Sequence, residues 1–278
     1  MRSSRGGIRP GGGSVSGNAS TTPTVQLHGP MLAAIVAAIP VTARNTGRPV
    51  IVVGGLAVLC RLSRPYRATT DLDTVSRLQT GQVGQLELLL AAGATPSGPT
   101  GVQVQTPLGP VQVDVLEVTD ADLAPLPDDP TDRLHVLSHA WAAQTATPVH
   151  LAADNAAPVT VLVARPPPLV AMKRQSVMNR GSAKEGTDLL DIVRLTTDPA
   201  TAASVIDGLR TADDQLTADA LLHARRWFHD SADRTLQRIR AIPEGASTTA
   251  EDLALVAELL GAALRPGEAP IDDQLAAD

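Results

Sequence analysis

Aromatic residues are nearly absent from this sequence: its 278 residues include two Trp, one Tyr and one Phe. A stacking platform for single-stranded nucleic acid needs several aromatic rings, so we do not expect this kind of binding surface. The hydrophobic core must instead be aliphatic. Cys60 is the only cysteine, which excludes an intrachain disulfide and the zinc sites that are built from several cysteines.

Long hydrophobic runs and an excess of positive charge are also missing. No apolar run approaches the roughly 20 residues that span a bilayer, so no membrane partner is expected. The formal net charge of -6 excludes a basic footprint over the whole surface, although a local basic groove remains possible. Residues 1–24 are rich in Gly, Ser and Arg and lack the apolar segment of a secretory signal. We predict a flexible leader and a cytoplasmic protein.

The remaining composition is typical of a globular protein, with 43% hydrophobic and 19% charged residues. Periodicity predicts a mixed α/β part over residues 25–165 and a helical part over residues 166–278, joined at three consecutive prolines. Strands are expected over residues 49–53, 69–75, 102–105, 111–118 and 159–163. Helices are expected over residues 31–39 (ended by Pro40), 56–62, 85–92 and from 169 onward, with breaks near Pro199, Gly208 and 242–248.

Gly54 and Gly55 follow a β-branched run and precede a predicted helix. Glycine lets a backbone approach a ligand closely, and the N-terminus of a helix presents free N–H groups to a phosphate. The pair is therefore a candidate phosphate-binding turn. Two glycines alone are also common in ordinary loops, so this motif gains meaning only from its neighbours.

Three aspartates supply the candidate chemistry. Asp71 and Asp73 are two residues apart on a predicted strand, so both carboxylates point to one face and Leu72 points to the other. Asp114 lies on the polar side of a strand that is otherwise rich in valine. If the two strands are neighbours, the three acids form a site for Mg²⁺, a hard ion that prefers oxygen ligands. Such a triad can hold two metal ions about 4 Å apart and support an in-line phosphoryl transfer.

The order Gly54-Gly55 followed by Arg67-x-Thr69-x-Asp71-x-Asp73 resembles the opening signature of polymerase-β-like nucleotidyltransferases. It is most similar to the AbiEii branch and the MenT-type toxin nucleotidyltransferases. The resemblance covers roughly residues 50–195. Its later part includes a lysine, Lys173, and an Asp-x-x-Asp segment formed by Asp188 and Asp191. One departure is Leu56, where many relatives carry a Ser or Thr that reaches a phosphate.

The resemblance implies a mixed-sheet nucleotidyltransferase core and a helical C-terminal lobe, with the active site in the cleft between them. It implies that an NTP, such as ATP or CTP, donates a nucleotide to an RNA acceptor, such as the 3′ end of tRNA, and that a cognate antitoxin protein is the partner. By the resemblance, Asp71, Asp73 and Asp114 bind Mg²⁺ and carry catalysis with Lys173 and Asp188. The nucleotide would be bound by residues Gly54, Gly55, Arg67, Thr69 and Lys173.

Several alternatives remain open at this stage. Arg67 could equally bind a phosphate or pair with a carboxylate. For Thr69, a structural role is favoured over a catalytic one. Either Asp188 or Asp191 could be the fourth acid of the motif. His135 and His139 are four residues apart on a predicted helix, but no third zinc ligand is evident nearby. The acceptor is alternatively a small molecule or a protein, and a non-catalytic subunit that binds a partner belongs to a different class.

Overall fold

The computed structural model describes residues 22–179 and 182–264, so most of the expected leader lies outside the described residues. One mixed sheet contains all the strands of the described part. These strands are β1 (Thr24–Leu27), β2 (Ile51–Val52), β3 (Asp71–Leu78), β4 (Thr95–Pro96), β5 (Gly101–Thr106), β6 (Gly109–Thr119), β7 (Thr147–Ala153) and β8 (Ala156–Val163).

Helices cover the sheet and then form the rest of the chain. Those of the sheet-forming part are α1 (Pro30–Thr46), α2 (Gly54–Arg61), α3 (Gln85–Ala91), α4 (Asp120–Leu123) and α5 (Pro130–Thr145). The helical part contains α6 (Pro166–Asn179), α7 (Ser182–Thr197), α8 (Ala202–Arg210), α9 (Asp214–Arg225), the π-helix η1 (Arg226–Asp230), α10 (Ala232–Arg240), the 3-10 helix η2 (Pro243–Gly245) and α11 (Ala250–Ala263). A mixed α/β region followed by helices is the fold class that the sequence predicts.

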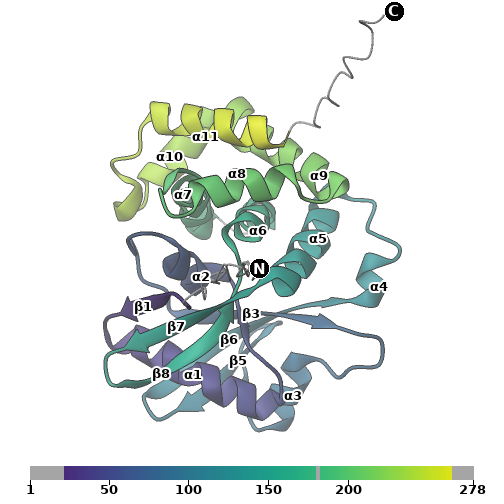
Figure 1. The fold of residues 1–278 in the computed structure, drawn as a ribbon, viewed down its shortest axis with the longest axis vertical. Coiled ribbons are helices and arrows are strands. Elements are labelled where there is room, and N and C mark those ends of the chain that lie inside the picture. The colour runs from purple at the N-terminus through teal and green to yellow at the C-terminus, as the bar shows by residue number, and fades with distance from the viewer. Residues whose placement is uncertain (1–21, 180–181, 265–278) are drawn as a thin grey trace, which may run out of the picture.

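The strand order of the sheet is β1-β7-β8-β2-β3-β6-β5-β4. Helix α1 lies along one face, and α5 and α6 lie between the other face and the helices α7 to α11 (Figure 1). The polar face of β3 is thus turned toward α5 and α6, while Leu72 is fully buried on the opposite side. No helix within the described ranges is both long enough and apolar enough to cross a membrane.

Strands β3 and β6 are parallel neighbours at the centre of the sheet, and Asp73 is directly opposite Asp114 in their register. Strand β6 also pairs antiparallel with β5, which places Gly101 opposite Asp114 on its other side. The alternation along β6 buries Val113 and Val115 and turns Asp114 to the polar face. Local alternation and strand pairing therefore bring together acids that are about 40 residues apart in the sequence.

The sequence prediction that the first helix ends at Pro40 is wrong. Pro40 lies inside α1, which continues to Thr46 and ends at Gly47 in the left-handed conformation. Proline removes one backbone hydrogen bond, but the helix face beyond it still buries Thr42 and Thr46. The break expected near Gly208 lies at residues 211–213, between α8 and α9, and Gly208 itself lies inside α8, where it meets the ring of Pro167. Strands β1, β4 and β7 were not predicted.

Candidate active site

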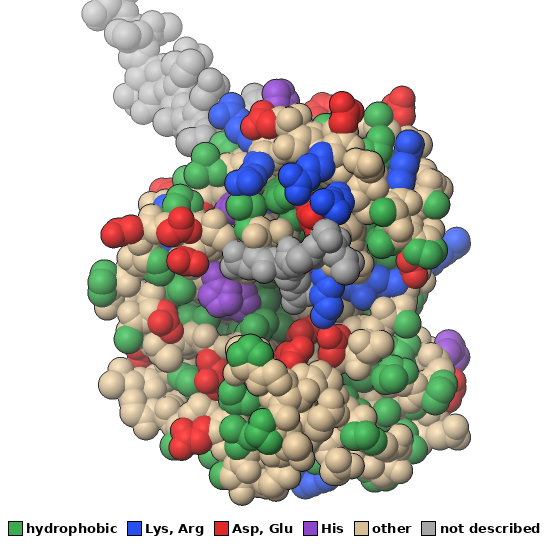
Figure 2. All heavy atoms as spheres, turned by 180° about the vertical axis from the view of Figure 1, so that it is seen from behind, with side chains coloured by type: hydrophobic (Ala, Val, Ile, Leu, Met, Phe, Trp, Pro, Cys, Tyr) green, Lys and Arg blue, Asp and Glu red, His purple; other side chains and the backbone are tan. Residues whose placement is uncertain are grey.

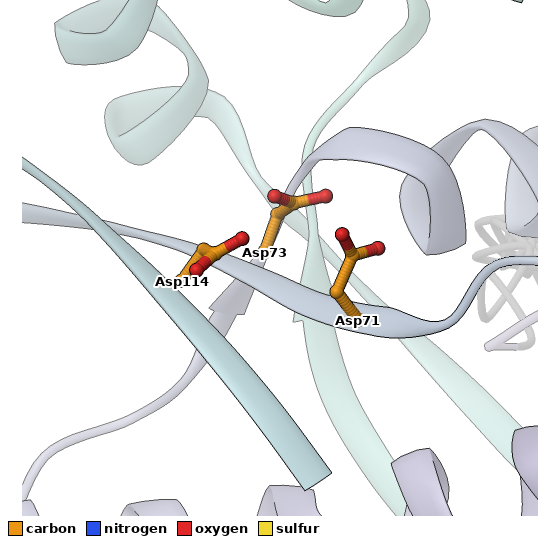
Figure 3. Close-up of side chains that lie close together, drawn as sticks. All are labelled: Asp71, Asp73 and Asp114. Carbon is orange, nitrogen blue, oxygen red and sulfur yellow. The ribbon is translucent and has the colours of Figure 1, made fainter. Parts of the chain in front are cut away.

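The carboxylates of Asp71, Asp73 and Asp114 face one another on the polar side of the sheet (Figure 3). One oxygen from each lies within 4.8 Å of the others. In the space-filling view from behind, acidic side chains gather near the middle of the face, and Lys and Arg side chains lie above them (Figure 2). A donor set of three carboxylates, all of them oxygen ligands, fits a hard divalent cation such as Mg²⁺. No other group of three or more His, Cys, Asp or Glu with this spacing is found among the described residues.

Glycines clear the space around these acids. Gly54 has a φ of 61°, and a Cβ built on it would lie 1.8 Å from Oδ2 of Asp73. On the other side of the triad, a Cβ on Gly101 would lie 2.5 Å from Oδ1 of Asp114. At Gly54 the carboxylate of Asp73 occupies the place of a side chain, and at Gly101 the amide nitrogen of Gln112, at 2.2 Å, lies there as well as the Asp114 carboxylate. Both positions therefore require glycine.

The N-terminus of α2 faces the same cluster. The backbone N–H of Gly55 donates to Oδ2 of Asp73 over 3.3 Å. A Cβ on Gly55 would crowd the hydroxyl of Thr69 at 2.7 Å and the guanidinium of Arg67 at 3.1 Å. The glycine pair thus makes room for protein side chains, whereas its role toward a triphosphate stays a prediction. Leu56, the residue after the glycine pair, is fully buried in the core.

Arg67 binds a carboxylate in this structure. Its Nη2 lies 2.8 Å from Oδ2 of Asp191, and its Nε donates to Oδ1 over 3.2 Å. The hydroxyl of Tyr66 donates to the same Oδ1. A guanidinium that holds a carboxylate with two parallel hydrogen bonds is fixed in orientation. Arg67 therefore pairs with a carboxylate, which was the alternative to a phosphate-binding role. Its predicted role in binding an NTP stays a prediction.

Lys173 is buried between two acids of α7. Its Nζ lies 2.5 Å from Oδ1 of Asp188 and 2.7 Å from Oδ2 of Asp191. Burial lowers the pKa of Lys173, but the charges of Asp188 and Asp191 outweigh it, and the net shift is upward. For Asp191, burial raises the pKa, but Lys173 and Arg67 outweigh it and bring the pKa below its usual value. The ammonium and the Asp191 carboxylate therefore both stay charged near neutral pH.

The two candidates for the fourth acid occupy different positions. Asp191 is fully buried behind Lys173 and bonds to Arg67 and Tyr66 as well. Asp188 lies nearer the triad, because it lines the cavity that also contains Asp71 and Asp73. Ser176 donates a hydrogen bond to Asp188 over 3.1 Å. The geometry places Asp188 at the site and Asp191 in the layer that supports it.

Two cavities meet at the triad. The smaller, of about 190 Å³, is polar and contains Asp71 and Asp188. Within it, the hydroxyl of Thr69 donates to Asp71 over 2.9 Å, and Lys184 approaches Asp71 at 3.9 Å. The larger, of about 360 Å³, extends under α5 and α6 and has both apolar and polar lining residues. Asp73 and Lys173 line both cavities.

The structure adds residues that the sequence reasoning did not assign to the site. Tyr66 precedes Arg67 and fixes Asp191, and the only available signal was its position beside the motif. The His135–His139 pair, considered and set aside for zinc, lines the larger cavity instead. Arg174, which follows Lys173 on α6, is fully buried, so it contributes nothing to a basic groove at the surface.

No family model matches this chain, and no curated protein matches it either. Among solved structures, one match is an antigenic nucleotidyltransferase-like protein from Paracoccidioides brasiliensis. It is 19% identical, covers 68% of this chain and 92% of that chain, and superposes with a TM-score of 0.37. A similarity of this size does not assign an activity, so the functional argument rests on the residues of the site.

Proposed function

We propose that this chain is a Mg²⁺-dependent nucleotidyltransferase that transfers a nucleotide from an NTP to RNA, with the 3′ end of tRNA as the first acceptor to test. The observation that carries the proposal is the meeting of Asp71, Asp73 and Asp114 within 4.8 Å, opposite the glycine-lined start of α2. The motif resemblance of the sequence supports the choice of reaction, and fold alone does not.

In the proposed reaction, the acceptor hydroxyl oxygen bonds to the α-phosphorus of the NTP, and the bond from that phosphorus to the bridging oxygen breaks. Pyrophosphate leaves, and the hydroxyl proton passes to a carboxylate oxygen of Asp114. Bound Mg²⁺, held by the three aspartates, would neutralise phosphate charge and lower the pKa of the attacking hydroxyl. Lys173, kept charged and fixed by Asp188 and Asp191, directs a point charge toward the phosphates.

The test is transfer of label from each of the four radiolabelled NTPs in the presence of Mg²⁺ and total tRNA. Asp71→Asn is expected to reduce transfer by a factor of about 100 or more, because a bound metal supplies several kcal/mol of transition-state stabilisation. Asp207→Asn is the matched control, since Asp207 is an exposed acid on α8 whose side chain forms an ion pair with Arg210, away from the triad. It should transfer as the wild type does.

The destination of the label separates the alternatives. Label on RNA supports the proposal. Label on protein or on a small hydroxyl compound would show that the acceptor is a protein or a small molecule instead of RNA. Absence of any transfer or NTP binding, with Asp71→Asn indistinguishable from wild type, would favour a non-catalytic binding subunit.

A toxin role with a cognate antitoxin belongs to the same proposal and rests on the motif resemblance. Expression of the wild-type chain is expected to arrest growth. Expression of Asp71→Asn should not arrest growth, and neither should the wild-type chain when it is co-expressed with the product of a neighbouring small gene. Equal growth with the wild-type and Asp71→Asn chains would contradict the toxin role but leave the transfer reaction standing.

A further inference from the structure

The larger cavity is lined by apolar and polar side chains, most of which have no role in the proposed reaction. Its walls include Leu116 of β6 and Leu169 and Met172 of α6, and it opens beside Asp73 and Lys173. A histidine cluster borders a hollow on the face seen from behind, with acidic side chains just below it (Figure 2). Its volume of about 360 Å³ lies in the range of small-molecule sites, which are mostly apolar with a few placed polar groups.

Gln175 is the first of those polar groups. It lies two residues after Lys173, lines the cavity and is 6% exposed. No hydrogen bond joins its side-chain amide to another described residue, and the amide is not among the fully enclosed polar groups without a partner, so it stays open toward the cavity. A side-chain amide offers both a donor and an acceptor, so Gln175 is suited to a ligand that supplies the complementary pair.

His139 is the second polar group, and its tautomer is fixed. Its Nδ1 lies 2.6 Å from the backbone carbonyl oxygen of His135. A carbonyl oxygen only accepts, so Nδ1 carries the proton and Nε2 presents a lone pair. Burial lowers the pKa of His139 to about 3, with the nearby His135 adding to the shift, so the ring is neutral at physiological pH. Nε2 makes no hydrogen bond to another described residue.

The ring of His135 adds a flat surface to the same cavity. The centroids of the His135 and His139 rings are 3.9 Å apart, with a tilt of 39° between their planes. Planar rings offer stacking surface to a heteroaromatic ligand. The cavity thus combines an apolar wall, a ring surface and two buried polar groups with unused hydrogen-bonding capacity.

We propose that this cavity binds the base of the NTP and that His139 and Gln175 select bases with an exocyclic amino group beside a ring nitrogen. In adenine and cytosine, the amino group would donate to Nε2 of His139, and the ring nitrogen would accept from the amide of Gln175. In hypoxanthine and uracil, a carbonyl oxygen would meet the lone pair of Nε2. This inference rests on the proposed function, because it assumes that the triphosphate lies at the triad.

The cavities are placed consistently with this assignment. Asp73 and Lys173 line both, so an NTP with its phosphates near the triad extends its base into the larger cavity without leaving the site. The smaller cavity then remains for the acceptor end, beside Thr69 and Lys184.

The experiment measures equilibrium binding of CTP, UTP, ATP and ITP to the purified chain with Mg²⁺ and without acceptor. CTP and UTP form one pair, and ATP and ITP form the other. Within each pair, a carbonyl group replaces the exocyclic amino group and the size of the base hardly changes. In the pair that the cavity accommodates, the amino nucleotide is expected to bind at least about tenfold tighter, because a site built to form a hydrogen bond rejects an analogue that lacks it.

Two variants test the assigned residues. Gln175→Met keeps the volume but removes the amide, and His139→Asn keeps a donor for the His135 carbonyl but removes the Nε2 acceptor. Each should reduce the amino-over-carbonyl ratio toward one, mainly through weaker binding of the amino nucleotide. Gln237→Met, at an exposed position of α10, is the control and should leave the ratio unchanged. Far-UV circular dichroism verifies that each variant is folded.

The outcomes are distinguishable from failure of the proposed function. If wild type binds NTPs and transfers a nucleotide but binds both members of each pair within about threefold, this inference is overturned and the reaction stands. The same holds if the ratio survives in both variants, or if an RNA 3′-terminal nucleoside, rather than the NTP, competes for the cavity. If wild type binds no NTP, both proposals fail together.

Discussion

Gly54 and Gly47 share a left-handed backbone but differ in what surrounds them. Their φ angles are 61° and 64°, yet a Cβ on Gly47 meets nothing within 4 Å, whereas one on Gly54 would overlap Asp73. We expect Gly47→Ala to lower the free energy of unfolding by about 1–2 kcal/mol, the cost of the left-handed conformation. Gly54→Ala should lose more than this and also displace Asp73.

Urea unfolding and calorimetric titration with Mn²⁺ as a substitute ion measure these two effects. Gly47→Ala should retain metal binding at the wild-type level, and Gly54→Ala should lose it. Retention of metal binding in a folded Gly54→Ala protein would show that Asp73 does not need the space that glycine leaves.

The Asp191–Lys173 contact should appear in the pH dependence of stability. The pKa of Asp191 is lowered in the folded chain, so its contribution is present above its unfolded pKa of about 3.9 and is lost as the pH falls through the folded value. The pKa of Lys173 is raised, so its contribution is present below about 10.4 and is lost as the pH rises through the folded value.

Melting temperatures measured across this pH range should therefore fall at both ends. Asp191→Asn should destabilise the chain at pH 7 by about 3–5 kcal/mol, because it leaves buried cations with less compensation. It should also flatten the acid limb, while Asp207→Asn changes neither. An unaltered acid limb in Asp191→Asn would show that this carboxylate does not couple to stability.

At the residue scale, the direction of side chains along a strand was predictable from the sequence. Asp71, Asp73 and Asp114 lie on one face because strand geometry turns every second side chain the same way. The partner of Arg67 was not predictable, because Asp191 is 124 residues away and spacing carries no information on how α7 docks. Which buried polar groups keep unused capacity, as Gln175 does, follows only from packing.

Gly208 and Gly261 show how an element's interior glycine acts. A Cβ on Gly208 of α8 would lie 2.3 Å from Cγ of Pro167, but a Cβ on Gly261 of α11 meets nothing within 4 Å. Gly261→Ala should stabilise the chain by up to about 1 kcal/mol through better helix propensity. Gly208→Ala should destabilise it, since a rigid proline ring cannot yield without moving α6.

Thermal unfolding of the two variants decides the point, with opposite signs expected. If Gly208→Ala were as stable as Gly261→Ala, the close packing of α8 on α6 would not exist in solution. Because α6 carries Lys173, a shift of α6 should also weaken NTP binding in Gly208→Ala and leave it intact in Gly261→Ala.

At the element scale, strongly patterned segments were predictable and context-dependent ones were not. The hairpin of β5 and β6 follows from two β-branched runs around a Pro-Leu-Gly-Pro turn. Strand β7 contains Pro148 and His150 and has weak alternation, and it forms because β1 and β8 pair with its two edges. The first helix was predicted to end at Pro40, whereas the buried face of α1 continues past this residue.

For the whole molecule, the site joins the sheet to the helical part. Asp71, Asp73 and Asp114 come from the sheet, and Lys173 and Asp188 come from α6 and α7. The ion pair between Arg133 of α5 and Asp219 of α9, at 2.7 Å, is a second connection. A ligand that contacts both sides is therefore expected to stabilise the two parts as one unit.

Metal removal tests this expectation. The proposed Mg²⁺ site is formed only in the folded chain, so Mg²⁺ at about 100 times its dissociation constant should add about 2.7 kcal/mol to the free energy of unfolding. Calorimetric scans in EDTA and in Mg²⁺ should show one transition that moves upward with the metal, and further with an NTP. Asp114→Asn should lose most of the metal-dependent shift, whereas Asp207→Asn should retain it. Two transitions of which only one responds would mean that the helical part does not share in binding, because a ligand held by both parts must delay the unfolding of both.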